Sequence, residues 1–119
     1  MPHLVKFTPI LRVKDLPAAL SFYTRVGFAI DFEFKFSEND RPHYAGVSRD
    51  GQSLHLSTFG ENGQTNTQVF VTVDDIDALH SEFAKAGLNC LAPEDMVWGQ
   101  REMSIRDLDG NVLRFAMPI

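Results

Sequence analysis

The chain has 119 residues and a mass of 13.4 kDa, which suits one domain and leaves little room for a second hydrophobic core. Its formal net charge of −5 would repel a nucleic-acid backbone, and its longest apolar runs are far shorter than a membrane span of about 20 residues. The single cysteine, Cys90, cannot form an internal disulfide, and no signal sequence is evident at the start, so we expect a cytoplasmic protein without nucleic-acid or membrane partners.

The first third of the chain predicts a strand, a helix and a second strand. Apolar and β-branched residues fill 4–13, which is typical of a strand. Apolar residues then recur at intervals of three and four, between a possible helix cap at Asp15 and a closing Gly27. Over 28–36, phenylalanine or isoleucine alternates with other residues, a period of two that a strand places on one face.

A hairpin follows these elements. Residues 43–49 and 52–58 each read as a strand, and the Asp50-Gly51 pair between them favours a tight turn. The first half of the chain therefore predicts the order β-α-β-β-β.

The second half repeats the first. A shift of 60 residues places 13–18 on 73–78 and Gly27 on Gly87, while a shift of 59 places 50–56 on 109–115. Several ordered matches at nearly one offset indicate a duplicated unit. Each copy is too small to cover its own sheet, so we expect the two copies to pair about a pseudo-two-fold axis around a shared concavity.

These observations predict one domain over 1–119 with an internal division. The first module spans about 1–59, a polar and glycine-rich linker spans about 60–66, and the second module spans about 67–119. The expected fold class is α+β, with two tandem βαβββ modules that form a curled mixed sheet around a concave cavity.

The chain resembles the vicinal oxygen chelate superfamily, and within it the bleomycin resistance proteins. The segment 106–111, Arg-Asp-Leu-Asp-Gly-Asn, is similar to the hairpin signature of the superfamily. The Tyr-Ala-Gly-Val piece at 44–47 and the Trp-Gly pair at 98–99 point to the binding-protein branch. The resemblance implies the glyoxalase/bleomycin resistance fold, and homodimers whose N-terminal strand is exchanged between subunits; Pro9 at the matching point is a possible hinge.

The resemblance also allows a test for a metal site. In the metal-dependent enzymes of the superfamily, facing positions carry His, Glu or Gln ligands, and these fall here on Thr8, His55, Gln68 and Arg114. A transition metal normally needs three or more good donors, whereas this set offers one histidine and a permanently positive guanidinium that repels a cation. We therefore predict no metal and no cofactor, with these positions vestigial.

A concavity without a metal can still bind a small molecule through aromatic and polar side chains. Trp98 beside Gly99 is poorly explained by core packing, which favours a ligand or dimer contact, whereas Phe32 and Phe34 suit a binding face and a core equally well. His55 can instead be a half-buried histidine bonded to a neighbour. We expect nearby acidic residues, Glu102 among them, to attract a cation. The candidate ligand-binding residues are Phe32, Phe34, Tyr44, His55, Trp98, Glu102 and Arg114, and none is a candidate catalytic residue.

The first hypothesis for function is therefore a homodimeric, metal-independent protein that sequesters bleomycin-type or similar cationic aromatic antibiotics and so confers antibiotic resistance. The alternative is a metal-dependent glyoxalase-like lyase or dioxygenase-like enzyme of the same superfamily, with His55, Gln68 and a carboxylate such as Glu102 around the metal. A third possibility is an accessory domain that holds a protein partner or nothing.

Overall fold

The computed structural model describes residues 1–60 and 63–119, so Glu61 and Asn62 of the predicted linker lie outside the described residues. The helices within these two ranges are too short to cross a membrane.

The first half of the chain forms one four-stranded sheet, which we call sheet A. Its elements are β1 (Ile10–Arg12), α1 (Leu16–Arg25), β2 (Ala29–Phe34), β3 (Tyr44–Arg49) and β4 (Gln52–Ser57). The strands lie in the order β1-β4-β3-β2, with β1 parallel to β4 and the other neighbours antiparallel. The predicted cap is confirmed, because the Asp15 carboxylate accepts a hydrogen bond of 3.1 Å from the Ala18 amide at the start of α1.

The second half forms sheet B with the same topology. Its elements are β5 (Gln68–Thr72), α2 (Ile76–Lys85), β6 (Glu94–Asp95), β7 (Gln100–Arg106) and β8 (Val112–Pro118). The strand order β5-β8-β7-β6 repeats that of sheet A, including the parallel pair at the start. Gly27 and Gly87, which share the predicted offset, both end a helix with positive φ, at +101° and +76°. The two βαβββ units are therefore confirmed.

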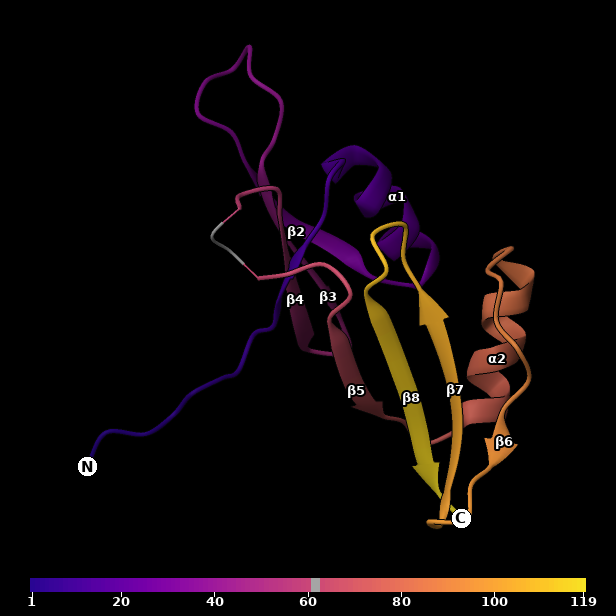
Figure 1. Cartoon of the computed structure of the whole chain (residues 1–119). Helices are drawn as coiled ribbons and strands as arrows, with labels where there is room; N and C mark the ends of the chain where they lie inside the picture. Colours follow the sequence, from indigo (N-terminus) through magenta and orange to yellow (C-terminus); the bar gives the residue numbers. More distant parts are fainter. Residues whose placement is uncertain (61–62) are drawn as a thin grey trace.

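Each sheet buries one face under its own helix and leaves the other face open. Figure 1 shows α1 lying against sheet A and α2 against sheet B. Residues that alternate along the strands form the buried faces: Leu11, Ala45, Val47, Leu54 and Leu56 in sheet A, and Met103, Ile105, Leu113 and Phe115 in sheet B. The residues between them face the open sides, where Phe32 and Phe70 are exposed while Glu102 is buried.

The segment between β7 and β8 joins the two halves. The Tyr23 hydroxyl of α1 donates a hydrogen bond of 2.8 Å to the buried Asp107 carboxylate. The Asn111 side chain, also buried, donates to the Arg12 carbonyl at 3.0 Å and accepts from the Thr67 amide at 3.0 Å. The residues that resemble the superfamily signature thus fasten the first module to the second.

The open faces do not close into one cavity. The described strands form two separate four-stranded sheets rather than one continuous curled sheet, and the radius of gyration is 15.4 Å. A compact chain of this length would have a radius of about 13.5 Å. The predicted concavity shared by both modules is therefore not enclosed within a single chain.

Two predicted strands differ in extent. The strand expected over 4–13 is reduced to β1, and the residues before it extend away from the body of the molecule with Leu4, Val5 and Phe7 exposed (Figure 1). The strand expected over 28–36 ends at Phe34 and carries a register shift between Ile30 and Phe32. This bulge breaks the simple alternation of the phenylalanines, because Ile30 lies opposite Val47 while Phe32 lies opposite Gly46.

Candidate functional site

An aromatic cluster occupies the open face of sheet A. The Tyr44 hydroxyl lies 2.8 Å from His55 Nδ1, within hydrogen-bonding distance. The Phe32 ring packs edge-on against His55, with centroids 5.3 Å apart, and stacks with Tyr44 at 6.2 Å. Burial raises the pKa of Tyr44, which keeps its hydroxyl protonated and able to donate. We call Phe32, Tyr44 and His55 the sheet A cluster.

Gly46 makes room for this cluster. A Cβ atom at Gly46, which is buried in β3, would meet the Phe32 ring. The ring therefore lies directly on the backbone of β3, between the side chains of two neighbouring strands. A glycine at this position lets the Phe32 ring approach the backbone of β3 beside Tyr44 and His55.

A second cluster occupies the open face of sheet B. The Trp98 indole Nε1 donates a hydrogen bond of 2.7 Å to one carboxylate oxygen of Glu102, and Arg114 Nε donates one of 2.6 Å to the other. The Arg114 guanidinium lies 5.4 Å from the Phe70 ring centroid and 6.0 Å from that of Trp98. We call Phe70, Trp98, Glu102 and Arg114 the sheet B cluster.

The hairpin turn between β6 and β7 presents Trp98. The Met96 amide donates to the Gln100 carbonyl at 2.7 Å and the Gly99 amide donates to the Met96 carbonyl at 3.1 Å, which closes a tight turn. Gly99 adopts a φ of +89°, a conformation that side chains disfavour. The turn holds Trp98 with 59% of its surface exposed while its indole N–H stays bonded to Glu102.

The charges of the sheet B cluster are paired with each other. Hydrogen bonds from Arg114 and then Trp98 lower the pKa of the buried Glu102, and the bond to Glu102 raises the pKa of Arg114. Both Glu102 oxygens are therefore already engaged by the protein. The expectation that Glu102 attracts a cationic ligand is at odds with this geometry, because the nearest cation is the protein's own Arg114.

The lowered pKa of Glu102 predicts a measurable pH dependence. The folded-state pKa lies below that of a free glutamate, about 4.3, so the stabilisation is present above this pH and is lost as the pH falls through the folded-state value. We expect the Trp98 indole N–H resonance to shift as the pH falls, with a midpoint below about 4.3. In the Arg114→Gln variant the midpoint of this shift should move to higher pH, because the main cause of the lowered Glu102 pKa is removed. A wild-type midpoint above that of a free glutamate would contradict the pairing.

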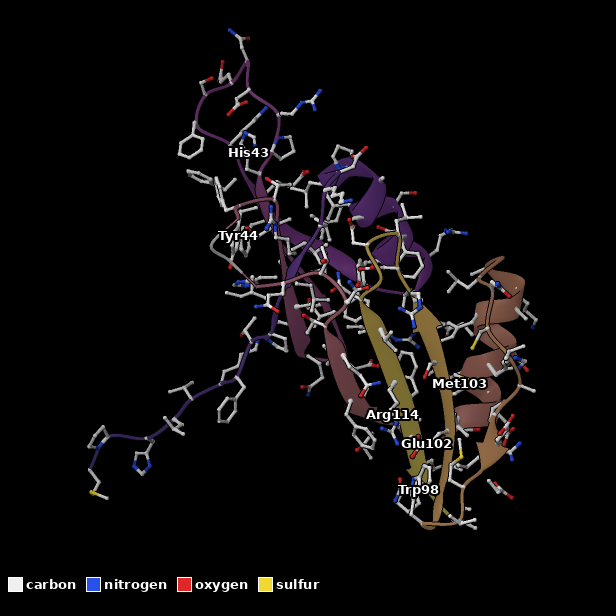
Figure 2. All side chains as sticks on the ribbon, viewed as in Figure 1. His43, Tyr44, Trp98, Glu102, Met103 and Arg114 are labelled. Carbon is white, nitrogen blue, oxygen red and sulfur yellow. The ribbon has the colours of Figure 1, made fainter. Side chains whose placement is uncertain are left out.

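The predicted site residues fall into two groups that lie far apart in one chain. Figure 2 shows Tyr44 in the upper part of the molecule, and Trp98, Glu102 and Arg114 together near the opposite end. Phe34 lies directly opposite Tyr44 in the pairing of β2 and β3, and its ring packs edge-on against Phe36 at 5.3 Å between centroids. The structure thus brings together Phe32, Tyr44 and His55, and separately Trp98, Glu102 and Arg114.

The residues at the superfamily's metal positions do not fit a metal. His55 shares a hydrogen bond with Tyr44, and the Arg114 guanidinium is held by Glu102. Thr8 and Gln68 contribute only neutral oxygens. Over residues 1–60 and 63–119, no group of three His, Cys, Asp or Glu side chains lies close enough together to hold a metal ion. We therefore assign no chemistry to a metal at these positions.

Sequence reasoning missed two residues of these clusters, Phe70 and Gly46. Phe70 lies directly opposite Arg114 in the parallel pairing of β5 and β8, and 54% of its surface is exposed. Its alternation with buried-face Val69 and Val71 is a sequence signal that could have placed it on the open face. Gly46 gave no such signal, since only the folded strand shows which ring lies over it.

Two βαβββ units with paired four-stranded sheets and open faces define a protein of the glyoxalase and bleomycin resistance fold. A family model described as "Glyoxalase superfamily protein" matches residues 3–118. The chain therefore belongs to the glyoxalase superfamily. A search of curated proteins found no match.

Solved structures agree with this fold. A bleomycin-binding protein from Streptomyces verticillus, in complex with copper(II)-bleomycin, is 30% identical over 97% of each chain with a TM-score of 0.74. TnmS3, an antibiotic binding protein from Streptomyces sp. CB03234, is 25% identical over 100% of this chain and 99% of that one, with a TM-score of 0.79. A glyoxalase-related enzyme from Clostridium phytofermentans is 22% identical over 99% and 98%, with a TM-score of 0.78.

Proposed function

We propose that this chain is a metal-independent binding protein that sequesters bleomycin-type or similar cationic aromatic antibiotics in the cytoplasm and so confers resistance. The observation that carries the proposal is the sheet B cluster. Where metal-dependent relatives are expected to place a ligand, this chain has Arg114 bound to Glu102 and lying close to two aromatic rings. Such a surface offers stacking and hydrogen bonding but no vacant coordination position.

The comparisons support an antibiotic-binding role. The relative with 30% identity is a bleomycin-binding protein, and another with 25% identity is an antibiotic binding protein. Both align along nearly the whole of this chain, so the likeness includes both open sheet faces. Bleomycin-type antibiotics carry a flat aromatic unit and a cationic tail, which match exposed aromatic rings on a protein of net charge −5.

We further propose that the protein is a homodimer in which the binding site combines the open face of sheet A from one subunit with that of sheet B from the other. The open faces and the N-terminal segment support this, because a monomer leaves Phe32, Phe70 and Trp98 44%, 54% and 59% exposed and Phe7 82% exposed. A second copy would bury this apolar surface. It would also bring together the two clusters that one chain keeps apart.

Exchange of the N-terminal strand is part of this proposal. The Pro9 carbonyl accepts a hydrogen bond of 2.9 Å from the His55 amide, and within the described ranges the one side-chain hydrogen bond of residues 1–7 runs from Lys6 Nζ to Ser53 Oγ at 2.6 Å. We expect the full chain to have the mass of a dimer by native mass spectrometry, and a chain lacking residues 1–8 to shift strongly towards monomer. A monomeric full chain would contradict the dimer, and an unchanged dimer without residues 1–8 would contradict the exchange.

Titration with metal-free bleomycin tests the proposed function. Trp98 is the one tryptophan in the sequence, so its fluorescence reports directly on the sheet B cluster. We expect saturable quenching at one ligand per subunit with a dissociation constant in the nanomolar to micromolar range, and recovery of the ligand with unchanged mass. Absence of saturable binding would rule out bleomycin as a ligand of this protein. Near-stoichiometric zinc, nickel, iron or manganese in the purified protein, lost in His55→Ala, would favour the metal-dependent enzyme instead.

A further inference from the structure

The Arg114 side chain presents donors that the described residues leave unused. Its Nε donates to Glu102, while no hydrogen bond or ion pair joins its two terminal nitrogens to residues 1–60 or 63–119. About a third of the side chain is exposed on the open face of sheet B. A guanidinium carries five N–H donors in a rigid planar fork, so four of them remain for a ligand.

The surroundings of Arg114 fix its position before any ligand arrives. Glu102, which is 5% exposed, holds Nε from one side. The Phe70 and Trp98 rings lie within 6.0 Å of the guanidinium carbon, and Trp98 is itself bonded to the same carboxylate. Little side-chain freedom is left to lose on binding, which favours tight recognition. Figure 2 shows Arg114, Glu102 and Trp98 gathered at one end of sheet B.

The chemistry of this arrangement selects one kind of ligand group. Because Glu102 and Arg114 neutralise each other, the cluster offers no free negative charge, and a cation placed on the same rings would meet the guanidinium. A ring that stacks on Trp98 or Phe70 would also exclude water from the free N–H donors. Donors deprived of water are costly unless the ligand supplies acceptors.

We propose that Arg114 is the specificity-determining residue of the sheet B cluster and that it binds a carboxylate or carbonyl oxygen on the planar aromatic part of the ligand. The inference rests on the proposed function in placing the ligand on this face, and deepens it by naming the group recognised there. The positive charge of a cationic antibiotic then lies away from Arg114. A carboxylate fits best, since a guanidinium bonds it through two parallel N–H donors.

A neighbouring cavity gives such a ligand room to continue. It has a volume of about 510 Å³, lies between β7 and the segment 89–96, and is lined in part by Met96, Glu102 and Ser104. Glu102 thus contributes both to this cavity and to the hold on Arg114. Glu102 thus links the position of a ring on Trp98 to this cavity along β7.

Three probes that share one ring system test the proposal. They are 2-naphthoate, 2-naphthamide and 2-naphthylmethylammonium, titrated against the full chain while the Trp98 indole N–H resonance is followed by NMR. We expect the carboxylate to bind tightest, the neutral amide next and the ammonium weakest. An ammonium probe that binds as tightly as the carboxylate, or failure of all three at millimolar concentration, would overturn the proposal.

Substitutions of Arg114 provide the second readout. We expect Arg114→Gln to lower the affinity for 2-naphthoate by about tenfold or more, since a charged hydrogen-bonding partner is lost. The ammonium probe should bind this variant at least as well as wild type, because Glu102 is released. Arg114→Lys should recover only part of the carboxylate affinity, as it keeps the charge without the fork. Arg41→Gln, an exposed arginine outside both sheets, makes the same change in net charge and should alter nothing.

The same variants separate this inference from the proposed function. If bleomycin binds wild type and Arg114→Gln equally and the probes show no preference for the carboxylate, the inference is wrong while the binding function stands. If bleomycin does not bind but 2-naphthoate binds in an Arg114-dependent manner, the proposal of an antibiotic ligand is wrong while the assignment of Arg114 stands. If Arg114→Gln proves unfolded, the ranking of the three probes on wild type still decides the proposal.

Discussion

Replacing Asp107 with alanine is expected to lower the free energy of unfolding by about 3–5 kcal/mol. Asp107 is 7% exposed and accepts hydrogen bonds of 2.8 Å from the Tyr23 hydroxyl and 2.9 Å from the amides of Asp109 and Asn111. The Asn111 side chain donates a further bond of 3.0 Å. Without the carboxylate these donors lose their partner, and the fully buried Tyr23 hydroxyl has no water to replace it.

This substitution also tests how the two modules are joined. Tyr23 belongs to the first module and Asp107 to the second, so the loss should loosen the contact between sheets as well as the β7–β8 turn. Urea unfolding measures the change. Tyr23→Phe removes one donor and is expected to cost about 1 kcal/mol, while Asp74→Ala at an exposed position should cost less than about 0.5 kcal/mol. A loss below about 1 kcal/mol in Asp107→Ala would show that the network is not a stabilising joint.

Replacing Trp98 with alanine should raise the dissociation constant for bleomycin by about thirtyfold or more. This is the usual effect of truncating a central tryptophan in a binding site. The exposed indole offers stacking area, and it also bonds Glu102 and lies near the Arg114 guanidinium. Truncation therefore removes a contact surface and frees the side chains behind it. Calorimetric titration with bleomycin measures the change, since this variant has no tryptophan fluorescence.

Two further variants divide this effect into its parts. Trp98→Phe keeps an aromatic face but lacks the donor to Glu102, so it should retain more affinity than Trp98→Ala. Val97→Ala alters the neighbouring and fully exposed residue of the same turn and should leave binding unchanged. Equal loss in Val97→Ala and Trp98→Ala would mean that the turn as a whole, rather than the indole, determines affinity.

The repeated architecture was accessible from sequence because its signals are local. Asp15 and Asp75 accept hydrogen bonds from amides three residues ahead, Asp50-Gly51 turns a hairpin, and Gly27 and Gly87 end the helices with positive φ. Each depends on a few adjacent residues whose backbone preferences are strong. The bulge in β2 was not accessible, because a register shift depends on the partner strand.

The candidate site was accessible only in its residue types. Trp98 stood out because an indole beside glycine is poorly explained by core packing, and the structure places it in a turn with 59% of its surface exposed. The partners of Glu102 could not be foreseen from its sequence neighbours, since Arg114 comes from the adjacent strand twelve residues later. The expectation that Glu102 attracts a cation was made without this partner, because the sequence alone does not show which side chains lie beside a charge.

The sequence by itself determined two βαβββ units and the residue types at the superfamily's metal positions, which make a poor set of metal donors. Periodicity, caps and turns are local, and the chemical nature of a side chain does not depend on the fold. Only the tertiary structure decided which side chains meet. It separated Tyr44 and His55 from Trp98 and Arg114, and it paired Glu102 with Arg114, because strand register and sheet placement arise from contacts distant in the chain.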